Sequence, residues 1–388
     1  MSFSKPIYLD YAATTPVDIR VLEVMVPYFS EIFGNTSSIH YYGQRAEAAL
    51  EQARESMAKG LHCQPAEIIF TSCGSESDNL ALRGIALQAK AQRGANHLLI
   101  SPVEHHAILR TAQQLADTHG FELEYLPVNQ YGQVDPDDIK LRLKSTTAIV
   151  SVIYANNEIG SVNPIAEIGA ICQNAGIPFH TDAVQAAAYL PVDVTELNVD
   201  LLSLGAHKFY GPKGVGALFV RRGTPLLPML TGGGQESGRR AGTHNTAFIA
   251  GMARAFELAQ EERSQRTQHL LPLRDHLIGR VLESIPESRL TGHPEQRLPN
   301  HASFVFRNLD GNALLMMLDL EGFACSSGSA CKTGDPEPSE VLTAIGLPRE
   351  WALGSLRVTL GSDSNPDQIH EMTQALPDIV ERLQSLNA

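Results

Sequence analysis

Three absences in the 388-residue sequence restrict where the protein acts and what it binds. No apolar run approaches the roughly 20 residues that span a bilayer, and the first six residues do not open the apolar stretch of a secretory signal. No basic tract is present, and 43 acidic against 30 basic residues give a net charge of −13, which repels a phosphate backbone. We therefore expect a soluble, cytoplasmic protein that binds neither membranes nor nucleic acid, although a local site could still bind a small anion.

Several motifs of metal, redox and nucleotide sites are also absent. The five cysteines, at positions 63, 73, 172, 325 and 331, include no C-x-x-C pair, so neither a zinc site nor a thioredoxin-like couple is predicted. Most cysteines of this kind are buried, reduced thiols. No Gly-Lys-Ser/Thr follows Gly74, which excludes a Walker loop there, and no G-x-G-x-x-G follows the first strand candidate, which argues against a dinucleotide-binding dehydrogenase.

The length exceeds that at which one hydrophobic core usually stops growing, so we expect two domains. Short apolar runs alternate with helix-like segments through the first two thirds, which predicts an α/β domain with a mostly parallel sheet. The strand candidates are 67–72, 97–101, 148–154, 178–182, 200–204 and 216–220. Helix candidates between them include 44–61, 75–93 and 164–175.

After residue 264 the pattern changes to that of a smaller α+β domain. The candidates there are a helix at 265–284, strands at 302–306 and 356–360, and helices at 311–320 and 367–386. We assign residues 16–264 to a large domain, and 1–15 together with 265–388 to a small one. The Pro/Gly-rich stretches 231–242 and 326–338 are loops long enough to have a function.

Two segments place polar groups where a buried strand meets a helix. In Thr-Ser-Cys-Gly-Ser-Glu-Ser at 71–77, Gly74 and Ser75 would present free N–H groups to a phosphate. The alternative is ordinary helix capping by Ser75 with Asp78 three residues on. In His-Thr-Asp-Ala-Val-Gln at 180–185, Asp182 ends a strand at the edge where open sheets bind ligands, and its carboxylate needs a cationic partner. Helix capping would also explain it.

Two further segments offer nucleophiles. Lys208, after His207 in a glycine-rich connection between two apolar strands, is a candidate for a desolvated amine of lowered pKa, although a lysine near a turn is ordinarily just solvated. Cys331 lies in a loop of small polar residues at 324–334, next to Lys332, which favours a reactive thiolate. A Cys325–Cys331 disulfide is the alternative, and a reducing cytosol disfavours it.

Five additional polar residues are candidates for the site, although helix capping or surface pairing would also explain each of them. They are His105, Asn157, Arg240, Thr243 and Arg357.

Together these segments resemble the cysteine desulfurases of the NifS/IscS type, within the class V aminotransferase family of fold-type-I pyridoxal-phosphate enzymes. The resemblance extends from Tyr-Leu-Asp-Tyr-Ala-Ala-Thr-Thr-Pro at 8–16 to Ser-Leu-Arg-Val at 355–358. It implies a large domain with a mostly parallel seven-stranded sheet and a smaller α+β domain. It also implies a homodimer, pyridoxal 5′-phosphate as cofactor and L-cysteine as substrate.

The resemblance assigns roles to individual residues. Lys208 would bind the cofactor covalently and move the Cα proton, and Asp182 would pair with its pyridine nitrogen. His105 would stack on the ring as a further catalytic residue. The other cofactor ligands would be Asn157 and Gln185 near the phenolic oxygen, and Gly74, Ser75, His207 and, from a second subunit, Thr243 at the phosphate. Arg357, assisted by Asn35, would bind the substrate carboxylate.

By the same resemblance, the Cys331 thiolate would attack the substrate sulfur and hold it as a persulfide for an acceptor such as an iron–sulfur scaffold, while cysteine becomes alanine. Cys331 could also be a transient iron–sulfur ligand, and no resident metal is predicted. Alternatives are a cystine or selenocysteine lyase of the same fold, or a non-catalytic iron–sulfur-handling protein.

Three positions depart from the family pattern. Gly205 stands where a phosphate-binding serine often precedes the His-Lys pair, so cofactor affinity would be weaker or supplied otherwise. Ser237 stands where Glu-Arg-Gly is frequent. Cys325 is an extra thiol, which either packs or resolves the persulfide.

Overall fold

The computed structural model describes residues 6–328 and 337–387, and its main sheet has seven strands in the order β2-β8-β7-β6-β5-β3-β4. The strands are β2 (Ile68–Thr71), β3 (His97–Ile100), β4 (Glu122–Tyr125), β5 (Thr147–Ser151), β6 (Phe179–Asp182), β7 (Leu201–Gly205) and β8 (Gly216–Val220). β8 is antiparallel to both its neighbours, and the other pairs are parallel. The predicted α/β fold with a mostly parallel seven-stranded sheet is confirmed.

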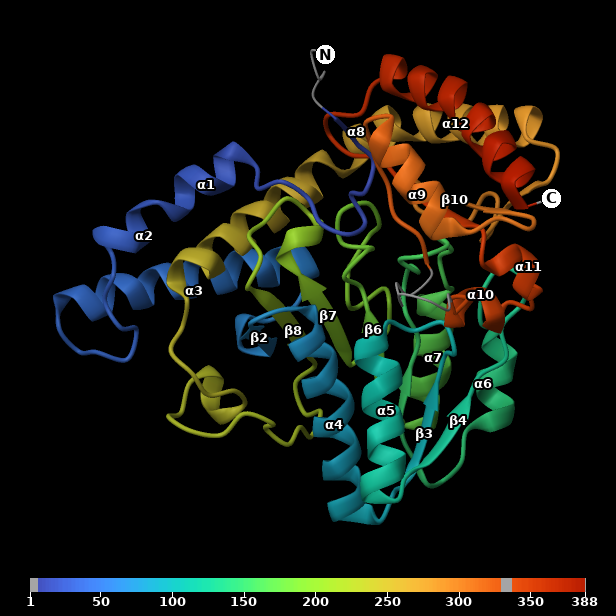
Figure 1. Cartoon of the computed structure of the whole chain (residues 1–388). Coiled ribbons are helices and arrows are strands. Elements are labelled where there is room, and N and C mark those ends of the chain that lie inside the picture. The colour runs from blue at the N-terminus through green and yellow to red at the C-terminus, as the bar shows by residue number, and fades with distance from the viewer. Residues whose placement is uncertain (1–5, 329–336, 388) are drawn as a thin grey trace.

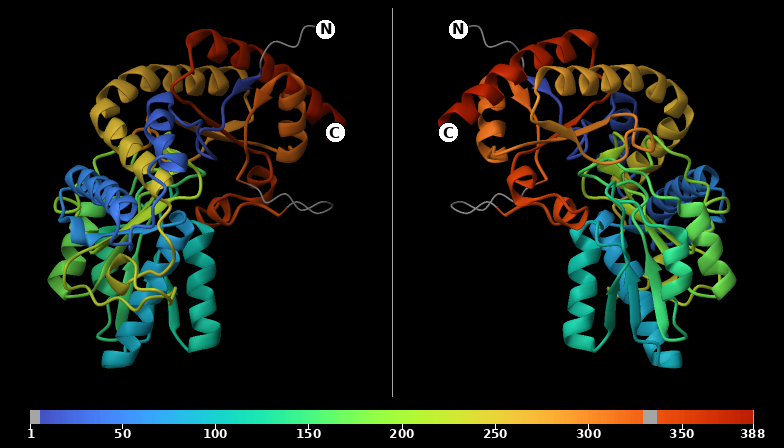
Figure 2. Two further views of the ribbon diagram at one scale, coloured as in Figure 1. Left: turned by 90° about the vertical axis from the view of Figure 1, so that its left-hand side faces the viewer. Right: turned by 90° about the vertical axis from the view of Figure 1, so that its right-hand side faces the viewer.

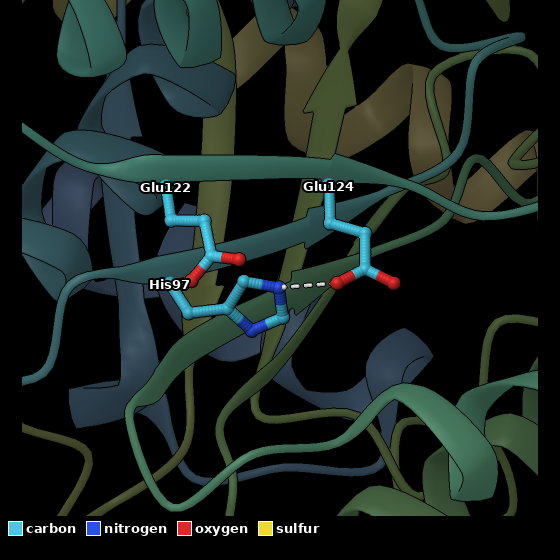
Figure 3. A group of neighbouring side chains, drawn as sticks. All are labelled: His97, Glu122 and Glu124. Carbon is cyan, nitrogen blue, oxygen red and sulfur yellow. Dashed lines mark hydrogen bonds and ion pairs between the residues drawn. The ribbon is translucent and has the colours of Figure 1, made fainter.

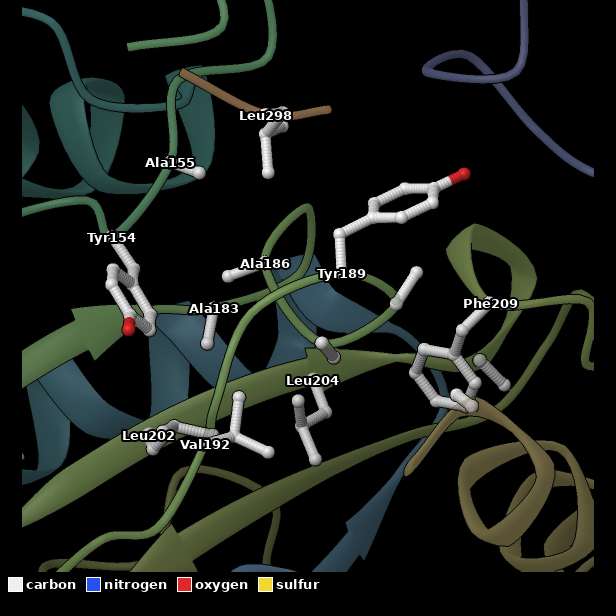
Figure 4. Packing of buried hydrophobic residues seen from close by; sticks show 14 of the residues in the cluster. Tyr154, Ala155, Ala183, Ala186, Tyr189, Val192, Leu202, Leu204, Phe209 and Leu298 are labelled. Atoms are coloured by element: carbon white, nitrogen blue, oxygen red, sulfur yellow. The ribbon is translucent and has the colours of Figure 1, made fainter. Parts of the chain in front are cut away.

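Helices cover both faces of this sheet (Figure 1). The helices are α3 (Tyr41–Leu61), α4 (Gly74–Arg93), α5 (His106–His119), α6 (Pro136–Arg142), α7 (Ile165–Ala175) and α8 (Thr246–Ser284). α4 and α5 pack on one face, and α3, α7 and α8 on the other. Figure 4 shows part of the core on the face covered by α3, α7 and α8, where Leu202 and Leu204 of β7 lie with Ala186, Val192 and Phe209. Strands buried on both faces explain the nearly continuous apolar runs of the sequence.

The C-terminal elements form a smaller group above the main sheet (Figure 1). Three of its strands form an antiparallel sheet in the order β12-β10-β9. A fourth, β11, pairs in parallel with β1 from the N-terminus. Their bounds are β1 (Ile7–Tyr8), β9 (Ser288–Leu290), β10 (His301–Phe306), β11 (Phe323–Ala324) and β12 (Ser355–Thr359). The remaining helices are α1 (Ile19–Met25), α2 (Pro27–Ser30), α9 (Gly311–Leu320), α10 (Glu340–Ala344), α11 (Arg349–Ala352) and α12 (Pro366–Asn387).

The predicted domain division stays a prediction, but two features bear on it. β1 pairs with β11, which supports grouping the first residues with the C-terminal part. The predicted boundary at residue 264, however, falls inside α8, a helix of 39 residues that arches from the main sheet to the C-terminal elements (Figure 2). The two parts therefore share one continuous helix.

The strand β4 is the main-sheet strand that the sequence did not predict. It is an edge strand whose side chains are exposed or half-buried, so it lacks the apolar run on which strand prediction relied. Glu122 and Glu124 of β4 lie beside His97 of β3 (Figure 3). One potential metal-binding atom of each side chain, a carboxylate oxygen or a ring nitrogen, lies within 4.8 Å of the other two. Lys144 Nζ already supplies the balancing charge, because it donates to both carboxylates at 2.7 Å. Charged side chains on an edge strand discourage pairing with another chain.

Within residues 6–328 and 337–387, no helix combines the length and the apolar character needed to cross a membrane.

Candidate active site

A cavity of about 250 Å³ lies at the carboxyl ends of β2, β6 and β7. This edge is where open α/β sheets bind ligands. Gly74 begins α4 after β2, Asp182 ends β6, and Lys208 ends the short 3-10 helix η2 (Ala206–Lys208) after β7. Nine predicted site residues line the cavity, namely Gly74, Ser75, His105, Asn157, Asp182, Gln185, His207, Lys208 and Arg357.

Lys208 is half-buried in this cavity and is not the fully solvated lysine of the alternative interpretation. Its Nζ donates hydrogen bonds to the carbonyl oxygens of Ala12 (2.6 Å) and Ala13 (2.7 Å). Burial, and next the positive charge of Arg357, lower the pKa of Lys208 to about 8. An amine of this pKa is more often uncharged near neutral pH, as a nucleophile requires.

The lowered pKa of Lys208 predicts how fast the cofactor-free enzyme captures an aldehyde. Below pH about 8 the amine is increasingly protonated, so the capture rate should fall about tenfold per pH unit and level off above that pH. Stopped-flow absorbance with pyridoxal phosphate, the predicted cofactor, measures this rate, with Lys208→Ala as the control. A rate that continues to rise up to the pKa of an ordinary lysine would contradict the assignment.

Asp182 is 5% exposed and faces the cavity from the end of β6. Its Oδ1 accepts a hydrogen bond from the Val184 N–H at 2.8 Å, but residues 184–189 form turns and not a helix, so the alternative of helix capping is wrong. Burial raises the pKa of Asp182, while nearby His105 and Lys208 lower it. A cation that enters the cavity would stabilise this carboxylate.

Two more buried carboxyl groups near Asp182 were missed by the sequence analysis. Asp78, which lines the cavity, is 1% exposed and Glu104 is 2% exposed. Among the described residues, no hydrogen-bond partner reaches Asp78 Oδ1 or Glu104 Oε2. Burial, and next the charge of Asp182, raise the pKa of both. Two buried acids that line the cavity, with Glu104 as a third nearby, favour a ligand that contributes positive charge.

The first turn of α4 supplies the predicted phosphate site. Its N-cap is Cys73, and in the described part of the chain no side chain caps this helix. Ser75 lies inside the first turn, so the alternative in which Ser75 caps the helix is wrong. Uncapped N–H groups at a helix start attract an anion. His207 lines the same cavity, and burial lowers its pKa to about 4, which keeps the ring neutral.

Gly205, one of the three departures from the family pattern, lies beside this turn. Its backbone is extended (φ −135°, ψ 116°), a conformation that any residue adopts. A Cβ added at Gly205 would lie 3.4 Å from Val184 Cγ1 and 3.5 Å from Gly74 N, which is ordinary contact. A serine hydroxyl at this position would therefore reach the phosphate site without strain.

We predict that Gly205→Ser strengthens cofactor binding roughly tenfold, because it adds one hydrogen bond to a charged phosphate. Equilibrium dialysis of the cofactor against the unliganded enzyme measures the dissociation constant. Gly205→Ala is the matched control, because it adds the Cβ without the hydroxyl and should leave the constant nearly unchanged. Equal effects of the two substitutions would show that the hydroxyl is irrelevant.

Arg357 of β12 is 8% exposed and is held in a fixed orientation. Its Nη2 donates to Asp10 Oδ1 at 2.9 Å and its Nη1 to the Asn157 carbonyl oxygen at 3.0 Å. In the described chain, its buried Nε has no hydrogen-bond partner. Asp10, whose Oδ2 also accepts from Ser326 Oγ at 2.8 Å, is a third residue that the sequence analysis missed. An oriented guanidinium at the cavity wall suits a carboxylate ligand.

His105 and Gln185 are positioned by backbone contacts. His105 is the N-cap of α5, and its Nδ1 accepts from the Ala107 N–H at 3.1 Å, so the capping alternative is correct for this residue. Burial lowers the pKa of His105. Gln185 Nε2 donates to the Ala12 carbonyl oxygen at 2.9 Å. The predicted contacts of these residues with a cofactor ring stay predictions.

Asn35 and Thr243 do not line this cavity within the described single chain. Both side chains are exposed. Their segments are joined by a hydrogen bond of 2.9 Å between Thr36 Oγ1 and His244 Nδ1, so they lie on one surface. Arg240 instead forms an ion pair with Glu76, with 2.8 Å between Nε and Oε1, which is the pairing alternative for that residue.

Cys331 lies outside the described residues, and so does its alternative disulfide with Cys325. Cys325 itself is partly buried and packs against the main core. Burial, and next the charge of Asp10, raise the pKa of Cys325. A thiol that stays protonated favours simple packing over a reactive role.

Over residues 7–372 the chain matches the family described as Aminotransferase class-V. The chain belongs to the class-V aminotransferase family. This class-V aminotransferase is 47% identical over 383 residues to a protein named Cysteine desulfurase IscS from Dictyoglomus turgidum, covering 99% of this chain and 96% of that one. It is 46% identical over 384 residues to the protein of the same name from Methanosarcina thermophila, covering 99% and 94%.

Solved structures agree with this family assignment. A NifS-like protein superposes with a TM-score of 0.90 at 35% identity, covering 97% of this chain and all (100%) of that one. A structure described as SspA in complex with cysteine superposes at 0.78 with 36% identity, covering 91% and 98%. The predicted resemblance and fold type are confirmed, and this chain is an enzyme of a pyridoxal-phosphate-dependent family.

Proposed function

We propose that this class-V aminotransferase is a cysteine desulfurase, which converts L-cysteine to L-alanine and takes the sulfur as a persulfide on Cys331. The observation that carries the proposal is the convergence of three groups on one cavity: the Lys208 amine, the Asp182 carboxylate and the Arg357 guanidinium. The names of the relatives that match nearly the whole chain support it.

The cavity fits pyridoxal 5′-phosphate. Lys208 would bind it covalently, and Asp182 would pair with its pyridine nitrogen, which supplies the positive charge that the buried carboxyl cluster favours. Gly74, Ser75 and His207 would hold the phosphate, His105 would cover the ring, and Asn157 and Gln185 would lie near the phenolic oxygen. When bound, the cofactor acts as an electron sink for the negative charge left at the substrate Cα.

The protein's own groups then have separate tasks. Arg357, already oriented by Asp10, binds the substrate carboxylate, and Lys208 takes the Cα proton. The Cys331 thiolate attacks the substrate sulfur, so one S–S bond forms as the C–S bond breaks; a proton added at Cβ and the proton that Lys208 returns to Cα complete alanine. The sum, cysteine plus thiol giving alanine plus persulfide, needs no external oxidant or reductant.

Replacing the proposed sulfur carrier tests this function. We predict that Cys331→Ala keeps the cofactor absorbance but lowers alanine production from cysteine by at least about a thousandfold, because the attacking nucleophile is gone. Mass spectrometry of the wild-type protein after cysteine addition should show a gain of one sulfur on Cys331. Full turnover by Cys331→Ala would instead indicate a cystine or selenocysteine lyase, which does not need this thiol.

The sulfur then requires an acceptor, which we propose to be another protein such as an iron–sulfur scaffold. A persulfide is a stable, enzyme-bound donor whose outer sulfur is transferred when a second thiolate attacks it. The name IscS of the relatives supports this class of acceptor.

We propose further that the enzyme is a homodimer. Large apolar side chains are exposed along α1, α2 and the start of α3, at one end of the molecule (Figure 1). They include Ile19, Leu22, Val26, Phe29, Phe33, Ile39, Tyr41 and Tyr42. An apolar surface of this extent normally binds a partner. Asn35 lies within it, and the adjoining Thr243 would enter the cavity of the second copy.

Charged substitutions on this surface test the dimer. Ile19 and Ile39 are 64% and 91% exposed, so glutamate at both positions should not disturb the monomer fold. We predict a dimer dissociation constant at least about a hundredfold higher, measured by sedimentation velocity, together with weaker cofactor binding. Leu141→Glu is the matched control, because Leu141 is 79% exposed on α6, away from this surface. A double variant that stays dimeric would exclude this interface.

A further inference from the structure

The turn after β5 contains Glu158, a half-buried acid to which the sequence analysis assigned no role. Its carboxylate lies beside Gly328, the described residue before the segment 329–336 that contains Cys331, and contacts Ser339, three residues after that segment. On the C-terminal side, Ser339 Oγ donates a hydrogen bond to Glu158 Oε2. On the N-terminal side, a Cβ added to Gly328 would lie 2.5 Å from Glu158 Oε2 and 3.3 Å from Ser339 Cβ, so the carboxylate fills the space beside this glycine.

The same turn is tied to the substrate-binding side of the cavity. The carbonyl oxygen of Asn157, the residue before Glu158, accepts from Arg357 Nη1 at 3.0 Å. The fully buried Asn156 fixes the turn, because its Oδ1 accepts from the N–H groups of Glu158 (2.8 Å) and Ile159 (2.9 Å). One short turn therefore contacts the arginine and Ser339, and it lies beside Gly328.

Ser339, which donates to Glu158, is also the residue that caps the start of α10. Ser339 is 4% exposed and is the N-cap of α10, accepting from Val341 N at 3.1 Å and Leu342 N at 3.3 Å. Burial raises the pKa of Glu158 to about 6, and the charges that face it are Arg357, which lowers this pKa, and Glu340, which raises it. Ionised above that pH, the carboxylate is a strong acceptor for the serine hydroxyl.

We propose that Glu158 is a positioning residue, which holds Gly328 and Ser339 together and so places Cys331 relative to the substrate bound at Arg357. This inference rests on the proposed desulfurase function. It assigns Glu158 no contact with the reacting atoms. A misplacement of about 1 Å between reacting groups can slow a reaction about a hundredfold, so fixing Ser339 and the space beside Gly328 would have a large effect on the rate.

Substitutions at Glu158 and Gly328 test the proposal in the cofactor-loaded enzyme. Glu158→Gln keeps an acceptor oxygen of the same size, so persulfide formation on Cys331 in a single turnover should stay within about threefold of wild type. Glu158→Ala should slow it about tenfold or more. Glu340→Ala is the matched control, because it removes the neighbouring carboxylate without touching Gly328, and it should have no effect. Cofactor content and the concentration of cysteine needed for half-saturation should change less than twofold in all three.

A double-mutant cycle makes the test specific. Gly328→Ala places a methyl group against the Glu158 carboxylate and should slow persulfide formation alone, but it should have little further effect once Glu158→Ala has removed that carboxylate. Additive effects of the two changes would overturn the proposal. So would equal loss of cofactor binding, cysteine binding and rate in Glu158→Ala, because that is the pattern of a merely structural residue.

A second measurement does not depend on turnover. The rate at which iodoacetamide alkylates Cys331, followed by peptide mass spectrometry, should change at least about threefold in Glu158→Ala and not in Glu340→Ala. An unchanged alkylation rate in Glu158→Ala would contradict positioning. If the wild type forms no persulfide, the desulfurase function fails, while this alkylation comparison still decides whether Glu158 positions the cysteine.

Discussion

The buried carboxyl groups around the cavity impose the strongest physical constraint on this fold. Asp182, Asp78 and Glu104 are each at most 5% exposed, and a charge in that environment costs several kcal/mol unless an opposite charge or a proton compensates it. Within the described chain, the groups that favour the charged form of Asp182 are His105 and Lys208, and burial lowers the pKa of both. A protein that retains such a cluster gains from a ligand that contributes a cation, and the aromatic cofactor of the family has a protonated pyridine nitrogen to do so.

That arrangement depends on chain segments far apart in the sequence. The N-terminal segment supplies Ala12 and Ala13, whose carbonyl oxygens accept from Lys208, and Asp10, which orients Arg357. β1 of the same segment pairs with β11, just before the cysteine segment. The site therefore forms only when the first residues, the main sheet and the C-terminal elements have come together, and no single element contains it.

The sequence predicted best what depends on local patterns. The predicted bounds of β8 and α9 coincide with those in the structure, because an apolar strand between glycines and a short apolar helix have clear ends. β4 was missed because its exposed side chains give no apolar run. Lys208, Asp182 and Gly74 were found from their places at strand ends and from the family resemblance. Asp10 lay within a quoted motif, but its partnership with Arg357 is a contact across 347 residues.

Other parts of the site could not be predicted for a different reason. Glu104 is buried because of tertiary packing. From the sequence alone, an acid next to two histidines cannot be distinguished from an exposed one. Asn35 and Thr243 were assigned to the site by resemblance, yet in one chain they lie on an exposed surface. The proposed dimer would bring them to a cavity, and a contact between two copies leaves no local pattern in the sequence. Glu158 also gives no local signal in the sequence, because its partner Ser339 lies 181 residues away in the same chain.

The uninterrupted course of α8 has a consequence for how this architecture can change over time. A helix of 39 residues that packs at one end on the main sheet and at the other on the C-terminal elements couples the two parts, although Pro272 in its interior removes one backbone hydrogen bond. Relative movement of the two parts then requires this helix to bend, and an interior proline is a usual place for a helix to do so. Gene recombination could therefore not exchange the C-terminal part as an independent module without cutting a helix that belongs to the core shared by both parts.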